Sequence, residues 1–411
     1  MPLVSFSLRQ KQLKICHLLL LNIYILSNIV ASVVSFTTGE LGGDFAGFNT
    51  PSFLAILTII LGIVASFILV MIVSFNFFSR MTRTEITSFE SEPPRLILSL
   101  FVLIIQSAYL IYSVYYNAGI AGLISKNESL AKYFFYVLSA DFLFLFYFAS
   151  SSSSKFVIFN TMIFVVSNVL RGWASWYLYL GWLIVIKIVW KRRVSFKMIA
   201  ISAVAGIALM PIVLFLKIFF RLSAAGVDYS EILSILGLEY VDLLDIYSDS
   251  FMQLFQRLQH FSSIAVIWNN LEIFRDQLSS GVVKIFFLEG FIGLFLNHFF
   301  SVSGVNELNT IVISILQNTD MLESGSATHI GIIGWMIVAY EYIPFYLCYL
   351  IFLMLLSHVL VKYSRSKEVS ELNWLIWLLL LMHGWFGALT NFLVTGFIYF
   401  FLANSLRRIA K

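Results

Sequence analysis

Residues 53–79 read FLAILTIILGIVASFILVMIVSFNFFS, a hydrophobic stretch without a single charged side chain. About 20 apolar residues in a helix are enough to cross the ~30 Å hydrocarbon core of a membrane, so this stretch predicts a transmembrane helix. Comparable windows predict further spans, about ten (10–12) in all. They cover residues 15–36, 96–116, 133–149, 155–170, 173–190, 198–220, 343–362, 371–388 and 391–406.

The composition agrees with an all-α polytopic membrane protein. Sixty per cent of the residues are hydrophobic and only 12% are charged, and the mean hydropathy of +0.91 excludes an ordinary soluble domain. Cys16 and Cys348 both lie within apolar runs, which argues against a disulfide framework. We therefore expect a single membrane domain over residues 1–411.

Clusters of basic residues alternate along the chain with neutral or acidic connections. By the positive-inside rule the basic connections face the cytoplasm, which places both termini there. The net charge of +4 is a sum that hides this segregation of charge by side of the membrane, and it does not indicate nucleic-acid binding. The clusters are Arg9/Lys11/Lys14, Arg80/Arg83/Arg95, Lys191/Arg192/Arg193/Lys197, Lys362/Arg365/Lys367 and Arg407/Arg408/Lys411.

Residues 221–329 interrupt the series of apolar windows and form the largest predicted loop. They hold twelve of the 22 acidic residues and four basic ones, a net charge of −8, so the loop is expected on the opposite side of the membrane. Apolar segment 282–300 is hydrophobic enough to dip into the membrane, and 331–342 is either the outer turn of the next span or an interfacial helix. A charged insertion of this size is the place to look for function.

Four arginines on the loop side are candidate pyrophosphate ligands, because a guanidinium is a rigid, doubly donating partner for phosphate oxygens. Arg171 lies at a hairpin tip in VLRGW, where it is either an interfacial anchor or a phosphate ligand beside Gly172. Arg221 follows Lys217 by one helical turn and is either a snorkelling anchor or a ligand. Arg257 and Arg275 complete the set, although Arg275 could instead pair with Glu272 or Asp276 in its own helix.

Three other residues are candidate catalytic groups. His260 stands three residues after Arg257 in a stretch with helical periodicity, so the two side chains are expected on one helix face. His329 lies where the loop returns to the membrane, and Glu341 is the one acid of an apolar segment. Each could accept a proton from a substrate hydroxyl, or be structural. His298 and His383 are interpreted as interior histidines.

No nucleotide, dinucleotide or metal motif is present, and potential metal ligands are not clustered in the sequence. We therefore expect a reaction without cofactor or metal, driven by an activated substrate such as a lipid pyrophosphate.

In these features the chain resembles the Wzy-type O-antigen polymerases of Gram-negative inner membranes. The resemblance covers the whole length as architecture, and locally rests on Arg171 in LRGW, Arg257 in QRLQH, Arg275, and the re-entering segment ATHIGIIG at 327–334. It implies a glycosyltransferase C-like fold with a periplasmic loop, and transfer of a glycan from undecaprenyl pyrophosphate to another lipid-linked repeat unit. The implied partners are these donor and acceptor lipids and a chain-length regulator.

Two alternative functions stay open, an O-antigen ligase and a transporter. An O-antigen ligase would use the same donor with lipid A core as acceptor. A lipid-linked oligosaccharide flippase or other transporter would carry charges inside its spans and have short loops, whereas this chain has nearly uncharged spans and one very large loop.

Overall fold

The structure is a computed structural model that describes residues 2–81, 96–120, 130–152, 154–191, 208–209, 212–213, 215–223, 226–228, 231, 255–300, 307–317 and 328–409. Within these ranges the chain is helical and has no β-strand beyond one isolated bridge, Glu40 to Asn49. The expected all-α class is confirmed.

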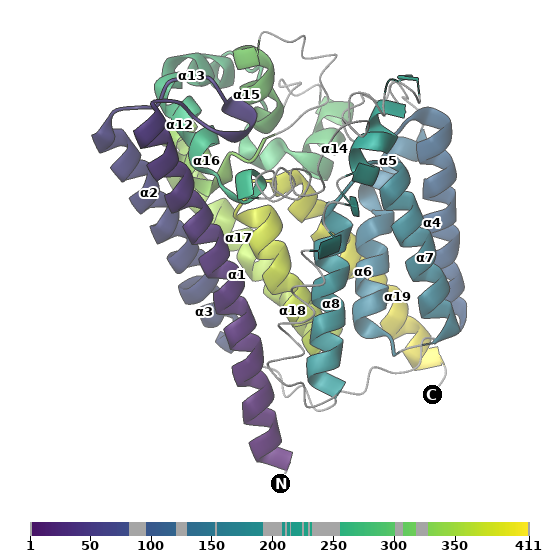
Figure 1. Cartoon of the computed structure of the whole chain (residues 1–411). Coiled ribbons are helices and arrows are strands. Elements are labelled where there is room, and N and C mark those ends of the chain that lie inside the picture. The colour runs from purple at the N-terminus through teal and green to yellow at the C-terminus, as the bar shows by residue number, and fades with distance from the viewer. Residues whose placement is uncertain are drawn as a thin grey trace.

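The first half of the chain folds into long, apolar helices (Figure 1). The run from 53 to 81 is one continuous rod whose middle turn, η2, is a π-helix. The elements are α1 (Pro2–Thr38), η1 (Gly43–Phe45), α2 (Phe53–Phe67), η2 (Ile68–Ser74), α3 (Phe75–Met81), α4 (Leu96–Tyr116), α5 (Leu130–Val137), α6 (Ala140–Ser150), α7 (Lys155–Leu170) and α8 (Ser175–Lys191).

The second half starts with short helices and ends with long ones. Its elements are α12 (Phe261–Asn269), α13 (Leu271–Ser279), η3 (Phe286–Leu288), α14 (Gly290–Phe300), α15 (Leu308–Gln317), α16 (Gly331–Val338), η4 (Tyr340–Tyr342), α17 (Ile343–Ser364), α18 (Lys367–Ile376), η5 (Trp377–Leu381) and α19 (Phe386–Ile409). Helices α12, α13 and α15 lie at one end of the bundle, which we call the loop end, and α1 begins and α19 ends at the other (Figure 1).

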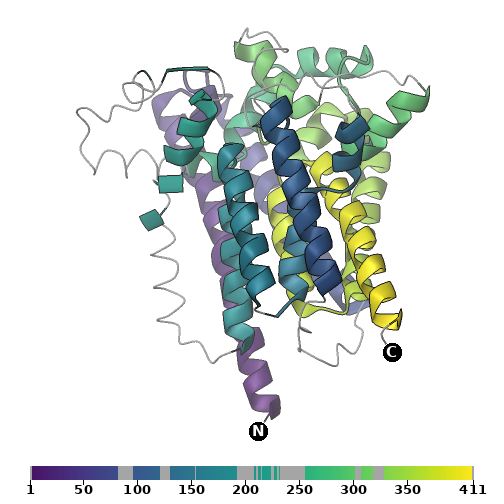
Figure 2. The ribbon, with the colours of Figure 1, turned by 90° about the vertical axis from the view of Figure 1, so that its right-hand side faces the viewer.

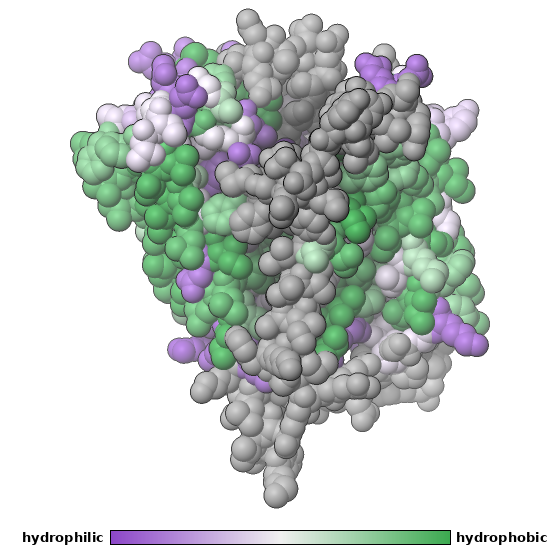
Figure 3. All heavy atoms as spheres, in the orientation of Figure 1, coloured by the Kyte–Doolittle hydropathy of each residue, from purple (hydrophilic) through white to green (hydrophobic). Residues whose placement is uncertain are grey.

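Among the described residues, six helices are long and apolar enough to cross a membrane: Gln12–Thr38, Phe53–Arg80, Leu96–Tyr116, Ala131–Ser150, Tyr340–Ser364 and Phe386–Arg408. Helices Lys155–Leu170 and Ser175–Val189 are apolar but shorter. Among the coloured atoms of Figure 3, hydrophobic side chains predominate at mid-height on both sides of the face, and hydrophilic ones gather toward its two ends. The chain thus has the architecture of a helical membrane protein, and the count of ten spans stays a prediction because most of the window 198–220 lies outside the described residues.

Polar side chains inside the bundle are hydrogen-bonded between helices. Gln106 of α4 donates to Asn160 of α7 at 2.8 Å, and Ser99 of α4 pairs with Tyr147 of α6 at 2.8 Å. In an apolar surrounding such bonds fix how neighbouring helices face each other. They help to hold α4, α6 and α7 as one packed group (Figure 2).

Three boundaries differ from the sequence prediction. The break between the last two predicted spans falls at 382–385, between η5 and α19, and not at 389–390. Segment 331–342, expected as one element, is divided into the helix α16, most of whose residues are buried, and the short turn η4, none of whose residues is buried. The single helix expected around Arg257 and His260 is interrupted at 259–260, because the amide groups that begin α12 bind the side chain of Asn28 instead of the preceding turn.

Candidate functional site

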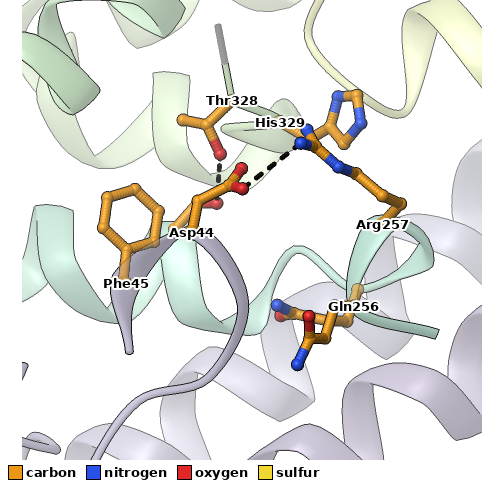
Figure 4. A pocket seen from close by; sticks show the side chains of 8 residues that line it. Asp44, Phe45, Gln256, Arg257, Thr328 and His329 are labelled. Carbon is orange, nitrogen blue, oxygen red and sulfur yellow. Dashed lines mark hydrogen bonds and ion pairs between the residues drawn. The ribbon is translucent and has the colours of Figure 1, made fainter. Parts of the chain in front are cut away.

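A polar pocket opens at the loop end, where segments distant in sequence meet (Figure 4). The α1–α2 connection, the start of α12 and the segment before α16 each contribute to it. Its lining consists of Asp44, Phe45, Gln256, Arg257, Gln259, Ser263, Thr328 and His329. Carboxylate, amide, hydroxyl, guanidinium and imidazole groups therefore share one small space, a set that can hydrogen-bond both phosphates and sugar hydroxyls.

The α1–α2 connection presents Asp44 through a tight turn. Leu41 N donates to Phe48 O at 2.7 Å to close the turn, and Gly43 has a left-handed φ of 72°. A Cβ at Gly43 would lie 3.4 Å from Nε2 of Gln259, so glycine also permits close packing against the segment before α12. Phe45 is 1% exposed and anchors the turn in the core.

Arg257 faces Asp44 across the pocket (Figure 4). Its Nη2 lies 3.4 Å from Asp44 Oδ1, and the side chains are 47% and 31% exposed. A single, partly solvated contact of this kind is a weak interaction. Arg257 is therefore available to an anion that enters the pocket.

Two further cations lie close to Arg257. Lys217 and Arg221 stand one turn apart on the helical segment 215–223, and the charges of Lys217, Arg221 and Arg257 repel one another. Burial and the neighbouring Arg257 lower the pKa of Arg221, and its buried Nε has no hydrogen-bond partner among the described residues. Among the described residues, these three cations have one acid, Asp44, beside them, and we call Lys217, Arg221 and Arg257 the cationic cluster.

The hairpin tip at 171–172 packs against this cluster through its glycine. Gly172 has a φ of 66°, and a Cβ there would lie 2.7 Å from Cγ of Arg221 and 3.3 Å from the carbonyl oxygen of Lys217. The predicted turn is confirmed, and glycine at its tip leaves room for the Arg221 side chain.

Three histidines meet beside the pocket. The ring centroids of His260 and His383 are 4.5 Å apart, those of His329 and His383 are 4.3 Å apart, and those of His260 and His329 are 6.4 Å apart. His260 and His383 are buried, whereas His329 lines the pocket. The sequence indicates an interior position for His383 but no role, and only the fold brings it to the other two histidines.

Backbone contacts at glycines hold these histidines in place. Gly331 N donates to His383 O at 3.1 Å, and both Gly331 and Gly384 have left-handed φ angles, 66° and 76°. A Cβ at Gly384 would lie 3.1 Å from Gly331 O. His383 itself follows the π-helix η5, whose irregular turn ends the helix just before it.

His260 is fixed from the first helix of the chain. The amide groups of His260 and Phe261 both donate to Asn28 Oδ1, at 2.7 and 3.0 Å, and Asn28 Nδ2 donates to Tyr24 O at 2.8 Å. Asn28 is fully buried. It caps the N-terminus of α12 from another helix, which satisfies two amide groups that α12 cannot bond internally.

Burial keeps His260 and His329 neutral. Loss of solvent lowers the pKa of each ring well below the ordinary value, and the neighbouring histidines lower it further. Arg257 and Lys217 act on the pKa of His329 in the same direction. One nitrogen of each ring, Nε2 of His260 and Nδ1 of His329, is buried without a hydrogen-bond partner among the described residues.

Arg171 lies at the predicted hairpin tip, and its side chain is buried and hydrogen-bonded on several sides. It is 4% exposed, its Nη2 lies 2.7 and 2.8 Å from the two carboxylate oxygens of Asp141, and its Nε donates to Ser167 O at 3.2 Å. Its Nη1 donates to the hydroxyl of Tyr109 at 3.3 Å. Arg171 is thus a buried, paired residue and not an exposed interfacial anchor.

Arg275 and Glu341 form a second group around Tyr340. The Arg275 guanidinium lies 3.9 Å from the centroid of the Tyr340 ring and donates to Ile337 O at 3.2 Å, while Tyr340 donates to Glu341 at 3.0 Å. The expected pair of Arg275 with Glu272 or Asp276 is not formed. Neither Arg275 nor Glu341 lines the pocket.

Within the part of the chain that the structure describes, no three His, Cys, Asp or Glu side chains are arranged to hold a metal ion. A scan against models of protein families, a search of curated proteins and a search of solved structures each found no match.

Proposed function

We propose that this chain is a membrane glycosyltransferase that polymerises polyprenyl-pyrophosphate-linked oligosaccharide repeat units, as an O-antigen polymerase does. The observation that carries the proposal is the cationic cluster of Lys217, Arg221 and Arg257 beside His329, at the loop end of an apolar helical bundle. A lipid whose tail lies along the apolar bundle would have its headgroup at the loop end, beside the cationic cluster. Three cations with one acid among them favour a ligand that carries more than one negative charge.

The same arrangement suits departure of a pyrophosphate. When the sugar–oxygen bond breaks, negative charge grows on the leaving group, and fixed guanidinium groups stabilise that charge without a metal ion. Two lipid-linked substrates confined to one depth of the membrane also meet more readily than free ones would. His329, which is neutral and lines the pocket, supplies a hydrogen-bonding group for a sugar hydroxyl.

On this proposal the chain lies in a bacterial inner membrane with both termini cytoplasmic, and the pocket faces the periplasm. The partners are the undecaprenyl-pyrophosphate-linked donor and acceptor, surrounding lipid and a chain-length regulator. Neither a nucleic acid nor a cofactor takes part.

The ligase is the second candidate, because it would use the same donor chemistry. Deletion of the gene separates the two functions. Loss of a polymerase leaves lipid A core with one repeat unit, whereas loss of a ligase leaves bare core and accumulated lipid-linked glycan. The lipopolysaccharide ladder of the deletion strain, with and without the wild-type gene supplied in trans, is the measurement, and a normal ladder after deletion would exclude both functions.

A further inference from the structure

The pocket contains an acid, Asp44, that no pattern in the sequence distinguishes from other acids. Asp44 sits on η1 and faces Arg257, whose Nη2 is 3.4 Å from its Oδ1 (Figure 4). With its side chain 31% exposed, it can be reached from the pocket. It is also the one carboxylate among the described pocket residues.

The fold holds Asp44 in this position. On one side, Phe45 is buried in the core, and on the other, Gly43 packs against the side chains of Gln256 and Gln259. The turn is closed by the bond from Leu41 N to Phe48 O and by a second bond, 3.2 Å long, from Thr50 N to Gly39 O. A backbone held in this way keeps Asp44 at the edge of the pocket, where its carboxylate is within reach of a bound hydroxyl, as a general base requires.

We propose that Asp44 is the general base that takes the proton from the acceptor hydroxyl in this pocket. This inference rests on the proposed function. In the step, the acceptor oxygen forms a bond to C1 of the donor sugar, and the bond from C1 to the pyrophosphate oxygen breaks. The pyrophosphate leaves with the bonding electron pair, and the hydroxyl proton passes to a carboxylate oxygen of Asp44.

Electrostatics favour Asp44 over His329 for this role. A proton on His329 would create a positive charge beside Arg257, Lys217 and two other histidines, all of which oppose it. A proton on Asp44 instead removes a charge, because the carboxylate becomes a neutral acid. The nearby positive charges therefore oppose a proton on His329 directly. A proton on Asp44 costs the attraction of its carboxylate to Arg257 and Lys217, which the negative charge of the departing pyrophosphate replaces.

Protonation of Asp44 also has a consequence for the leaving group. While ionised, Asp44 occupies one side of the Arg257 guanidinium. Once protonated, it no longer competes, so Arg257 becomes fully available at the moment when charge grows on the departing pyrophosphate. Proton transfer and leaving-group stabilisation are thereby linked through one ion pair.

The opposite role for Asp44 would be a plug that blocks Arg257 until substrate binds. The two roles predict opposite results for Asp44→Asn, which keeps the shape and removes the charge. Loss of a base lowers kcat by 10²- to 10⁴-fold, roughly the range expected for general base catalysis. Loss of a plug would lower KM for the donor and leave kcat equal or higher.

The experiment uses the full-length protein, purified and reconstituted, with polyprenyl-pyrophosphate-linked oligosaccharide extracted from the source strain. Glu40→Gln is the matched control, because Glu40 lies on the same connection with an exposed side chain outside the pocket. We expect Asp44→Asn to lose at least about 100-fold in kcat with the donor KM within about threefold, and Glu40→Gln to match the wild type. An unchanged or raised kcat in Asp44→Asn would overturn the proposal.

A second variant keeps the test decisive if Asp44→Asn folds poorly. Asp44→Ala leaves an empty space where the carboxylate was, which formate can enter. If the carboxylate acts as a base, sodium formate should raise the rate of Asp44→Ala at least tenfold. A correctly folded Asp44→Ala that formate does not rescue would count against the proposal. The wild type and Arg257→Ala are assayed in the same series. If the wild type forms no polymer, the proposed function fails; if the wild type is active and Asp44→Asn equals it, only the role of Asp44 fails.

Discussion

Two arginine regions at the loop end differ in how their charge is balanced. Arg171 is buried and bound by both oxygens of Asp141, by Ser167 O and by the Tyr109 hydroxyl. The cationic cluster has three positive groups near Asp44, a half-solvated contact at 3.4 Å, and a buried Arg221 Nε that lacks a hydrogen-bond partner among the described residues.

The difference separates an arginine that holds the fold from arginines that can bind a ligand. The Arg171 guanidinium already makes four hydrogen bonds and so has little to gain from a phosphate, whereas a cluster with surplus charge is stabilised by one. Both regions meet at one hairpin tip, where Arg171 points to Asp141 and the next residue, Gly172, packs on Arg221.

Arg257→Ala should abolish polymer formation, with at least a 100-fold loss of kcat/KM, because it removes the guanidinium that faces the pocket. Arg257→Lys should recover only part of the activity, since a lysine keeps the charge but loses the planar pair of donors. Polymer length on gels and rates with reconstituted protein provide the measurements. Arg80→Ala is the control, because Arg80 is an exposed cation at the end of α3, and full activity in Arg257→Ala would exclude the cluster as the anion site.

Arg171→Ala should act on stability, because it leaves the Asp141 carboxylate without its partner. Breaking a fully buried ion pair costs about 3–5 kcal/mol, and because the Asp141 side chain is 30% exposed and keeps a hydrogen bond from Asn168, we expect a loss at or below the lower end of that range. Thermal unfolding of the protein in detergent measures this loss.

The double variant Arg171→Met with Asp141→Leu replaces the pair by apolar side chains and should recover most of the stability and, with it, activity. A double variant that is as stable as the wild type yet inactive would show that Arg171 takes part in substrate binding after all.

Stability should fall as the pH drops below about 6.5. The folded state holds His260 and His329 with a lowered pKa, while the unfolded chain binds protons on both near the ordinary value of about 6.5. The unfolded state then carries more protons, so acid favours it, by up to about 1.4 kcal/mol per pH unit for each histidine. Unfolding midpoints at pH 7.5, 6.5 and 5.5 should show a steeper decline for the wild type than for His260→Gln with His329→Gln; equal slopes would contradict the prediction.

Gly172→Ala should weaken donor binding about tenfold, since its Cβ would displace the Arg221 side chain. Gly39→Ala is a matched control, because Gly39 also has a left-handed φ, of 78°, but no heavy atom within 4 Å of the added carbon. Both variants should lose about 1 kcal/mol of stability from backbone strain. Only Gly172→Ala should raise KM, and a similar KM change in both would mean that strain, not contact with Arg221, is responsible.

Features of the fold that depend on residues close together in the sequence could be predicted from it. The hydropathy of 53–79 indicated a membrane helix, and the turn at Arg171 and Gly172 followed from the polar break between two apolar runs. The break at 259–260 was missed, because a side chain from α1 replaces the usual helical bonds there.

The composition of the site could be predicted only in part. Arg221, Arg257, His260 and His329 were selected as charged or titratable groups in the loop, and the fold brings them near one another. Asp44 and His383 were not, since their importance arises from contacts with residues far along the chain. A short acidic turn between two spans carries no local pattern that distinguishes it from a solvated one.

The bond from α12 to Asn28 has a consequence for how the protein is made. During synthesis α1 enters the membrane long before residue 260 leaves the ribosome, so Asn28 Oδ1 waits in α1 while Nδ2 is already bonded to Tyr24 O. The pocket can form only when the start of α12 packs against α1 and its amide groups bond to Asn28 Oδ1. Assembly of the site therefore comes late in biogenesis, which delays any activity until the spans are in place.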